Sequence, residues 1–573
     1  MSSTRAQEIL DLMPSLGLST SPSCRAQAQS RITSLLSPAN AFPELWVDPY
    51  TISYGHRHNK RQYSDTSIRE AVDSIYAITF LLKTKALDRE SGAALLPAIM
   101  LCVRRLWDPL VHWLEFLHPR EENVVPSLDV VEAVATALMS FSVAKSHMSS
   151  LLEQTPQLYR LFMDLWLHFP AYTGTVQCFD PDTTEIFRDM SAIVLCTTLV
   201  TRPVSRDLDT TAVREALAAV KGRTRRLYRS AVECLWYCRD DRGDFNPEVV
   251  NGHLNAILFL VEDAMPIRLY PRDVVLSVVQ LIYKTESHPL DTQTPLAMLA
   301  CKLLHRIWST ADDNRSLIWA LKAGVLPLMM SLNKKLGDYD VSRAVMFALE
   351  RSVFLPVART LGGLENQSCF KQSELGEELD PNGFTEGELE LRFRIMRDLS
   401  DALKICANDQ CERKQPFDES ARVRVCPCFR ARYCSAGCQR AHWAQHGLKC
   451  SCWTLPRFRC DYGNLRPLEL HFAGIIGLYY LQRFVLHILE GFGAHAREQP
   501  SVGFSQKIII NCRQHVLPGY ELEFVKTQAG ARTGWVQVIM ELGGAPGNVF
   551  TISWGYRSVN AFRDAFVFDE ALE

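Results

Sequence analysis

Tyr433-Cys-Ser-Ala-Gly-Cys-Gln-Arg-Ala-His-Trp-Ala-Gln-His446 belongs to a segment whose residue spacing alone points to a fold. The complete pattern is Cys406-x4-Cys411-x14-Cys426-x-Cys428-x5-Cys434-x3-Cys438-x7-His446-x3-Cys450, with seven thiols and one imidazole. Structural zinc takes four nitrogen or sulfur ligands, and ligands close in sequence chelate one ion across a short loop. Eight such side chains therefore predict two structural Zn²⁺ ions with no open position for water.

The sequence predicts a helix at the end of this segment. Ser435 can cap a helix that runs through Gln439 to Gly447, because a serine side chain accepts a hydrogen bond from the first turn. His446 and Cys450 lie one turn apart on it and point the same way. This spacing favours His446 over His442 as the imidazole ligand.

The size of the segment supports the metal independently. Residues 406–450 contain few large aliphatic side chains and lie near the lower size limit for a core that folds unaided. A structural zinc contributes about 10–16 kcal/mol, against about 5–15 kcal/mol for the whole stability of a typical domain. Folding and metal loading are therefore expected to be a single event.

These residues resemble the MYND zinc finger family, most closely from Tyr433 to Cys450. Tyr433, Gln439 and Trp443 stand where that family usually has them. The resemblance implies a cross-brace, and it implies peptide-binding roles for those three residues because family members dock proline-containing segments of protein partners. In the implied cross-brace one zinc is held by Cys406, Cys411, Cys434 and Cys438, and the other by Cys426, Cys428, His446 and Cys450.

Two departures from the family pattern concern the ligand pairs. The first pair is four residues apart where two is more common, which a longer turn tolerates. The second pair has a single intervening residue, Pro427, where the family usually has two, so strain is expected at Cys426. The sequence leaves open whether Cys426 or Cys452 completes the second zinc site.

The chain before the finger predicts a mainly α fold, either an armadillo-like helical repeat or an irregular helical array. Apolar residues recur at three- and four-residue spacing from about residue 65 to 361. Between Leu317 and Leu332 a Gly ends one helix and a Pro opens the next, as in an armadillo turn. The expected helical stretches are 67–87, 93–117, 128–152, 158–169, 184–199, 212–238, 249–264, 271–284 and 295–308.

Five segments follow from changes in composition. They are a helical N-terminal segment and linker (1–64), the helical array (65–361), an acidic linker with an amphipathic lead-in helix (362–405), the finger (406–450) and a C-terminal α+β region (451–573). In the last region, 468–489 is expected to be a buried helix pair. Short gaps with turn residues favour antiparallel hairpins among four strands, 507–512, 520–526, 535–542 and 549–556.

Composition restricts the partners. A net charge of −2 gives no global attraction to phosphate backbones or anionic lipid. The finger has eight basic and four acidic residues, and its metal-bound thiolates reduce the net charge to about +1. Nucleic acid and membrane are therefore disfavoured as partners. The first 17 residues have no continuous apolar run, so an intracellular protein is expected, in nucleus or cytosol.

The most serious alternative is a lysine methyltransferase, because some MYND fingers are embedded in SET domains. The segments Asn511-Cys-Arg-Gln-His515 and Pro518-Gly-Tyr-Glu-Leu-Glu-Phe524 only faintly echo the expected motifs, and an early Gly-x-Gly is missing. Two further clusters favour structural interpretations over functional ones. Cys234 and Cys238 are expected to be core thiols, and the basic run 221–229 a solvated helix face. The expected function is a non-enzymatic scaffold that docks proline-containing partner segments through the finger.

Overall fold

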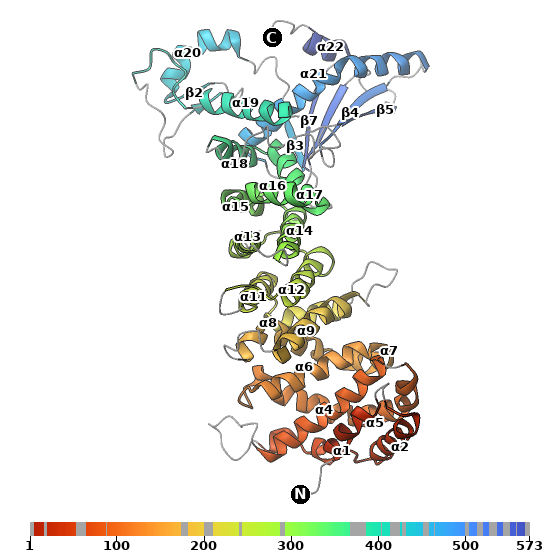
Figure 1. Ribbon diagram of the computed structural model, residues 1–573. Coiled ribbons are helices and arrows are strands. Elements are labelled where there is room, and N and C mark those ends of the chain that lie inside the picture. Colours follow the sequence, from red (N-terminus) through yellow and green to blue (C-terminus); the bar gives the residue numbers. More distant parts are fainter. Residues whose placement is uncertain are drawn as a thin grey trace. The chain divides into compact units, whose positions relative to one another are not determined.

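Helices make up most of the chain in the computed structural model, as the apolar periodicity predicts. The described residues are 5–16, 20–52, 65–87, 89–173, 181–199, 210–239, 243–286, 293–366, 386–402, 404–412, 424–426, 431–450, 458–462, 465–498, 504–512, 519–526, 536–542, 550–556 and 559–567. Figure 1 shows the helices and strands that they form. The chain divides into two compact units. Unit 1 is Met1–Ile267 with Ser287–Leu303, and unit 2 is Arg268–Glu286 with Leu304–Glu573.

Unit 1 is helical throughout its described residues. Its elements are α1 (Arg5–Leu12), η1 (Met13–Leu16), α2 (Pro22–Leu36), η2 (Pro43–Trp46), α3 (Pro49–Ile52), α4 (Thr66–Leu87), α5 (Arg89–Leu117), η4 (Pro119–Glu121), α6 (Leu128–Val143), α7 (Lys145–Gln154), α8 (Gln157–Tyr172), α9 (Pro181–Leu199), α10 (Thr210–Ala219), α11 (Thr224–Tyr237), α12 (Pro247–Phe259) and the π-turn η5 (Leu260–Ala264). Ser127 and Asn246 cap α6 and α12 with their side chains.

Two expected helices of unit 1 are each divided in two. The stretch 128–152 breaks at Ala144 between α6 and α7. The stretch 212–238 breaks at Lys221 and Gly222, which both have positive φ. The Gly222 amide donates to Leu217 O at 2.8 Å, as at a helix end closed by glycine. Cys234 and Cys238 are buried, so the core interpretation of these thiols is confirmed.

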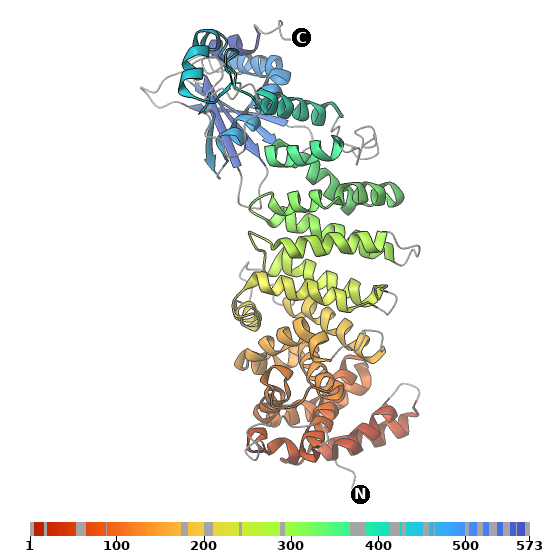
Figure 2. The same cartoon turned by 90° about the vertical axis from the view of Figure 1, so that its left-hand side faces the viewer.

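Unit 2 begins with a helical part that precedes the finger. It comprises α13 (Arg272–Glu286), the end of α14 (Thr294–Thr310), α15 (Arg315–Lys322), α16 (Val325–Leu336), α17 (Tyr339–Glu350), η7 (Arg351–Val353), α18 (Leu355–Asn366) and α19 (Glu386–Ala402). The helices coloured green in Figure 2 lie in successive layers, with α13 packed on α15 and α16, and α16 packed on α17. Whether these layers repeat as armadillo units stays a prediction.

A buried arginine connects three helical elements of unit 2. Arg392 of α19 is 3% exposed, and its guanidinium donates to Tyr480 Oη at 2.7 Å and Ser352 Oγ at 2.7 Å. It also donates to the carbonyls of Leu349 and Glu350 at 3.3 and 3.2 Å. Its Nε also donates to Tyr480 Oη at 3.2 Å, so each of the three guanidinium nitrogens has an acceptor, as a buried cation requires.

The C-terminal part of unit 2 contains a mixed sheet, which corrects the expectation of hairpins alone. Strand order is β3-β7-β6-β4-β5, and β4 pairs with β6 in parallel while the other neighbours are antiparallel. The bounds are β3 (Arg459–Tyr462), β4 (Phe504–Cys512), β5 (Gly519–Lys526), β6 (Val536–Leu542) and β7 (Phe550–Tyr556), followed by α22 (Val559–Val567).

One continuous helix, α21 (Pro467–Glu498), replaces the expected helix pair and packs on this sheet. Its glycines allow close approach: a Cβ at Gly477 would lie 2.8 Å from the Trp554 ring, and one at Gly491 would lie 2.7 Å from Leu522. By length and composition α21 could cross a membrane, but half of its apolar stretch is buried in the structure, as in the core helix of a soluble protein. α15 and α16 pass the same test only as one bent span.

Candidate metal centre

The finger is built from a short hairpin and one helix of unit 2. Strands β1 (Arg424–Val425) and β2 (Arg432–Tyr433) pair antiparallel, and α20 (Ala436–Lys449) follows β2 directly. Ser435 caps α20 as expected, because its side chain accepts from the Cys438 amide at 3.1 Å. The start of the segment is tied to β2 by the Ala407 amide, which donates to Arg432 O at 2.8 Å. These bonds place the start of the finger and the first turn of α20 beside the hairpin.

The first cluster contains four thiols, two from the loop before β1, one from the turn after β2 and one from α20. Donor atoms of Cys406, Cys411, Cys434 and Cys438 all lie within 4.8 Å of one another. The Cys411 and Cys434 sulfurs are 3.6 Å apart, and those of Cys434 and Cys438 are 3.4 Å apart. A tetrahedral site with Zn–S of about 2.3 Å places sulfurs about 3.8 Å apart. The cluster thus already has nearly the dimensions of a zinc site.

One thiol of this cluster is prepared for the thiolate form. Hydrogen bonds with Asn408 and then Ser435 lower the pKa of Cys438 to about 6. Asn408 is buried, whereas Cys438 is partly exposed. Since zinc binds the thiolate, these neighbours favour the metal-bound state at neutral pH.

The second cluster contains three described donors. Cys426, His446 and Cys450 have donor atoms within 4.8 Å of one another, and all three residues are buried. The two sulfurs are 3.6 Å apart, and His446 Nε2 lies 3.3 Å from Cys426 Sγ. Cys426 takes part despite the single residue that separates it from Cys428. Cys428 and Cys452 both lie outside the described residues, so the structure leaves the fourth ligand open.

The choice between the two histidines of α20 agrees with the geometry. His442 Nδ1 lies 3.1 Å from Tyr433 Oη, and its ring stacks on His446 at 5.7 Å between centroids. Burial, and then the proximity of His442, lowers the pKa of His446. A neutral imidazole is the form that coordinates zinc. His442 therefore supports the ligand, and His446 reaches the cluster.

A search against family models finds the MYND finger over residues 406–450. Residues 406–450 are a MYND finger. The two Cys/His clusters of this MYND finger are consistent with two structural zinc ions. No curated protein matches the chain. The MYND finger implies binding to protein partners in general, and it covers 45 of the 573 residues.

The three residues expected to bind peptide differ in accessibility. Trp443 of the MYND finger is 42% exposed and Gln439 is half-buried. Tyr433 is 0% exposed, with its ring against His442 and His446. In this structure Tyr433 supports α20 from within, and it offers no contact surface to a peptide. This corrects its expected peptide-binding role, because the aromatic ring fills the small core of the finger.

Sequence reasoning missed the apolar side chains exposed on and beside the MYND finger. Leu448 at the end of α20 is 90% exposed, Ile405 is 47% exposed and Val425 of β1 is 39% exposed. Together with Trp443 they give this small domain several exposed large apolar groups. The available signal was that the finger has two metal sites to fold around, so its few aliphatic residues need not be buried.

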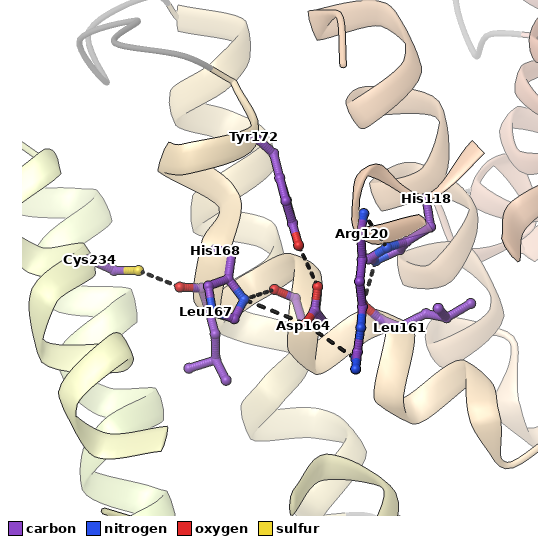
Figure 3. A network of polar contacts seen from close by, with 8 residues as sticks. All are labelled: His118, Arg120, Leu161, Asp164, Leu167, His168, Tyr172 and Cys234. Carbon is purple, nitrogen blue, oxygen red and sulfur yellow. Dashed lines mark hydrogen bonds and ion pairs between the residues drawn. The ribbon is translucent and has the colours of Figure 1, made fainter. Parts of the chain in front are cut away.

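Two polar clusters of unit 1 outside the finger have a structural interpretation. Asp164 of α8 accepts from Tyr172 Oη at 2.6 Å and pairs with Arg120 at 3.4 Å (Figure 3). Burial, and then the bond to Asp164, raises the pKa of Tyr172. The second cluster, Ser191 and His253, is completely buried.

The Ser191–His253 pair is satisfied by the helices around it. Ser191 Oγ accepts from Trp166 Nε1 at 3.2 Å and lies 3.4 Å from His253 Nδ1, while His253 Nε2 donates to Ala231 O at 2.6 Å. A serine and a histidine with 0% exposure cannot meet a substrate in this arrangement. The pair joins α8, α9, α11 and α12.

Proposed function

We propose that this protein is an intracellular interaction scaffold whose MYND finger docks proline-containing segments of partner proteins, without catalytic activity of its own. The observation that carries the proposal is the exposed Trp443 ring on α20. Aromatic surfaces bind extended proline-rich segments because such segments are already ordered before binding. Neither a membrane nor nucleic acid is part of the proposal.

The proposed binding surface depends on zinc through α20. Cys438, His446 and Cys450 belong to α20 or directly follow it, so the clusters fix the helix that carries Gln439 and Trp443. Behind the ring, a Cβ at Gly447 would lie 3.4 Å from Trp443 Cε2. The indole thus rests closely on its own helix, and its other side is available to a ligand.

A proline-rich peptide array tests the docking role. Wild type should bind a subset of the peptides, and Trp443→Ala should lose binding while retaining two zinc ions per chain. Gln445→Ala is the matched control, since Gln445 is also exposed on α20. Cys434→Ser should lose both zinc and binding. Unchanged binding by Trp443→Ala would refute the proposal.

The absence of catalysis is tested separately. Incubation with labelled S-adenosylmethionine and histone or other protein substrates should give no transfer, whereas a methyltransferase would label them. Affinity capture with wild type and Cys438→Ser then defines which partners the finger holds. Partners lost only with the variant depend on the zinc-bound finger.

A further inference from the structure

We propose that β5 is a second docking site, which accepts an extended partner segment with basic and apolar residues in alternation. β5 is an edge strand among the described residues, since it pairs with β4 alone in the order β3-β7-β6-β4-β5. Figure 1 shows β5 at the outer side of the sheet. Peptide groups of an edge strand that point away from the sheet can pair with an added strand.

The strand lacks three features that commonly prevent such pairing, and the charged side chains that it carries restrict which partner it can accept. β5 runs for eight residues without proline, and its register with β4 is regular from Gly519 to Lys526. Bulges, proline and very short length are the common ways of blocking an edge. β5 therefore presents a regularly paired template of above-average length.

The inner face of β5 indicates apolar residues in the partner. Tyr520, Leu522 and Phe524 point towards α21 but are only half-buried. Phe524 stacks on His495 with centroids 3.7 Å apart, and Tyr520 packs on Phe484. The layer between β5 and α21 thus ends at these side chains. Apolar residues at every second position of an added strand would extend this layer and increase its burial.

The outer face indicates basic residues in the partner. Glu521 and Glu523 are exposed on it, two residues apart. Lys507 pairs with Glu523 at 2.7 Å, and it belongs to β4, the strand that already pairs with β5. Opposite charges on neighbouring strands stabilise pairing, and like charges destabilise it. A segment with two basic residues separated by one apolar residue therefore matches both faces.

The same charges disfavour a second copy of this chain as the occupant. If two β5 strands paired antiparallel about Leu522, Glu521 of each copy would lie opposite Glu523 of the other. Both pairs would be repulsive. The partner also differs chemically from the proline-containing segments proposed for the finger, because proline cannot donate to a strand ladder.

The test uses the zinc-loaded full chain and a labelled peptide of the type Thr-Lys-Val-Lys-Val-Lys-Thr, measured by fluorescence anisotropy. The peptide should bind wild type and Trp443→Ala equally. Glu521→Lys combined with Glu523→Lys should weaken binding by about tenfold or more and gain binding of the matching Thr-Glu-Val-Glu-Val-Glu-Thr peptide. That exchange of specificity shows that the doubly substituted protein is still folded.

Backbone pairing is tested with two further versions of the basic peptide, N-methylated on alternate amides in opposite phases. Alternate amides of a strand point to opposite sides, so one phase should lose binding and the other should retain it. Absence of binding, equal binding by both phases, or no response to charge reversal would overturn the proposal. So would a β5-dependent dimer in sedimentation, since it would make a second copy the occupant.

Discussion

At the scale of single residues, unit 2 is organised around a charge that hydropathy assigns to the surface. Burial is the largest single influence on the pKa of Arg392 and acts to lower it, but Tyr480, Cys512 and Glu388 together outweigh burial, so the pKa is raised and Arg392 stays charged. Burial raises the pKa of Cys512 to about 12, which keeps this nearby thiol neutral. Glu388, one turn before Arg392, pairs with Arg483 of α21 at 2.8 Å. α19 is therefore fixed to its neighbours by oriented polar bonds as well as by apolar packing.

Arg392→Ala should be strongly destabilising. It leaves the Ser352 and Tyr480 hydroxyls without the buried cation that donates to them, and such losses cost about 3 kcal/mol or more. The free energy of unfolding from urea titration measures the effect. Arg394→Ala on the exposed side of α19 is the control and should change stability by less than about 0.5 kcal/mol. Equal effects of the two variants would contradict the network.

At the scale of elements, helix junctions and metal clusters decide the local fold. Gly324 separates α15 from α16 with φ of +81°, and the two helices are bent by 79° at this break. In the finger, the hairpin and α20 are instead connected through the two clusters. The two elements should respond to substitution in different ways, because one depends on backbone conformation and the other on ligands.

Gly324→Ala should destabilise unit 2 by about 1–3 kcal/mol. An alanine is strained at positive φ, and its Cβ would lie 2.7 Å from Tyr283 Oη. Thermal unfolding followed by circular dichroism measures the change. Gly363→Ala inside α18 is the matched control, since a Cβ there meets nothing within 4 Å and alanine is the better helix former. It should be neutral or slightly stabilising.

Removal of zinc should unfold the finger and leave the other helices in place. The cluster residues supply much of the buried core of the finger, as Cys406, Cys411, Cys426 and Cys450 are buried with Ala431 and Tyr433. Hydrogen exchange after chelation should show loss of protection confined to residues 406–450. Cys450→Ser should reproduce this effect and lower the zinc content, whereas Cys460→Ser in β3 should do neither. Full protection of the metal-free finger would contradict the coupling of folding to metal.

At the scale of the whole molecule, local signals in the sequence were sufficient for some features and not for others. The cap at Ser435, the helical periodicity and the spacing of the ligands act over a few residues, so the sequence contains them directly. The parallel pairing of β4 with β6 was missed because β5 lies between them in sequence, and turn residues report only neighbouring strands. The amphipathic pattern of the lead-in helix could not predict that Arg392 is buried, because its partner Tyr480 lies 88 residues away.

Three buried histidines should make the whole chain less stable in mild acid. Burial lowers the pKa of His118 and His253 in unit 1, and of His305 in unit 2, each to about 4. At pH 7 each of these imidazoles is mainly neutral in both the folded and the unfolded chain. As the pH falls from about 6.5 to about 4, the unfolded chain binds a proton that the folded chain does not, so stability is lost over that window.

The loss of stability in acid that one buried histidine causes can be measured at His253. Each such histidine contributes up to about 1.4 kcal/mol of lost stability per pH unit within the window. His253→Gln should remove one of these contributions and flatten the pH dependence of urea unfolding between pH 6 and pH 4.5 by about that amount. His112→Gln is the control, because it removes an exposed histidine of α5 and should leave the pH dependence of unfolding unchanged. If both variants kept the slope of wild type, burial of His253 would not be a source of acid sensitivity. A flatter slope in His253→Gln alone would show that the packing of α8, α9, α11 and α12 around a neutral imidazole is one source of the acid sensitivity of unit 1.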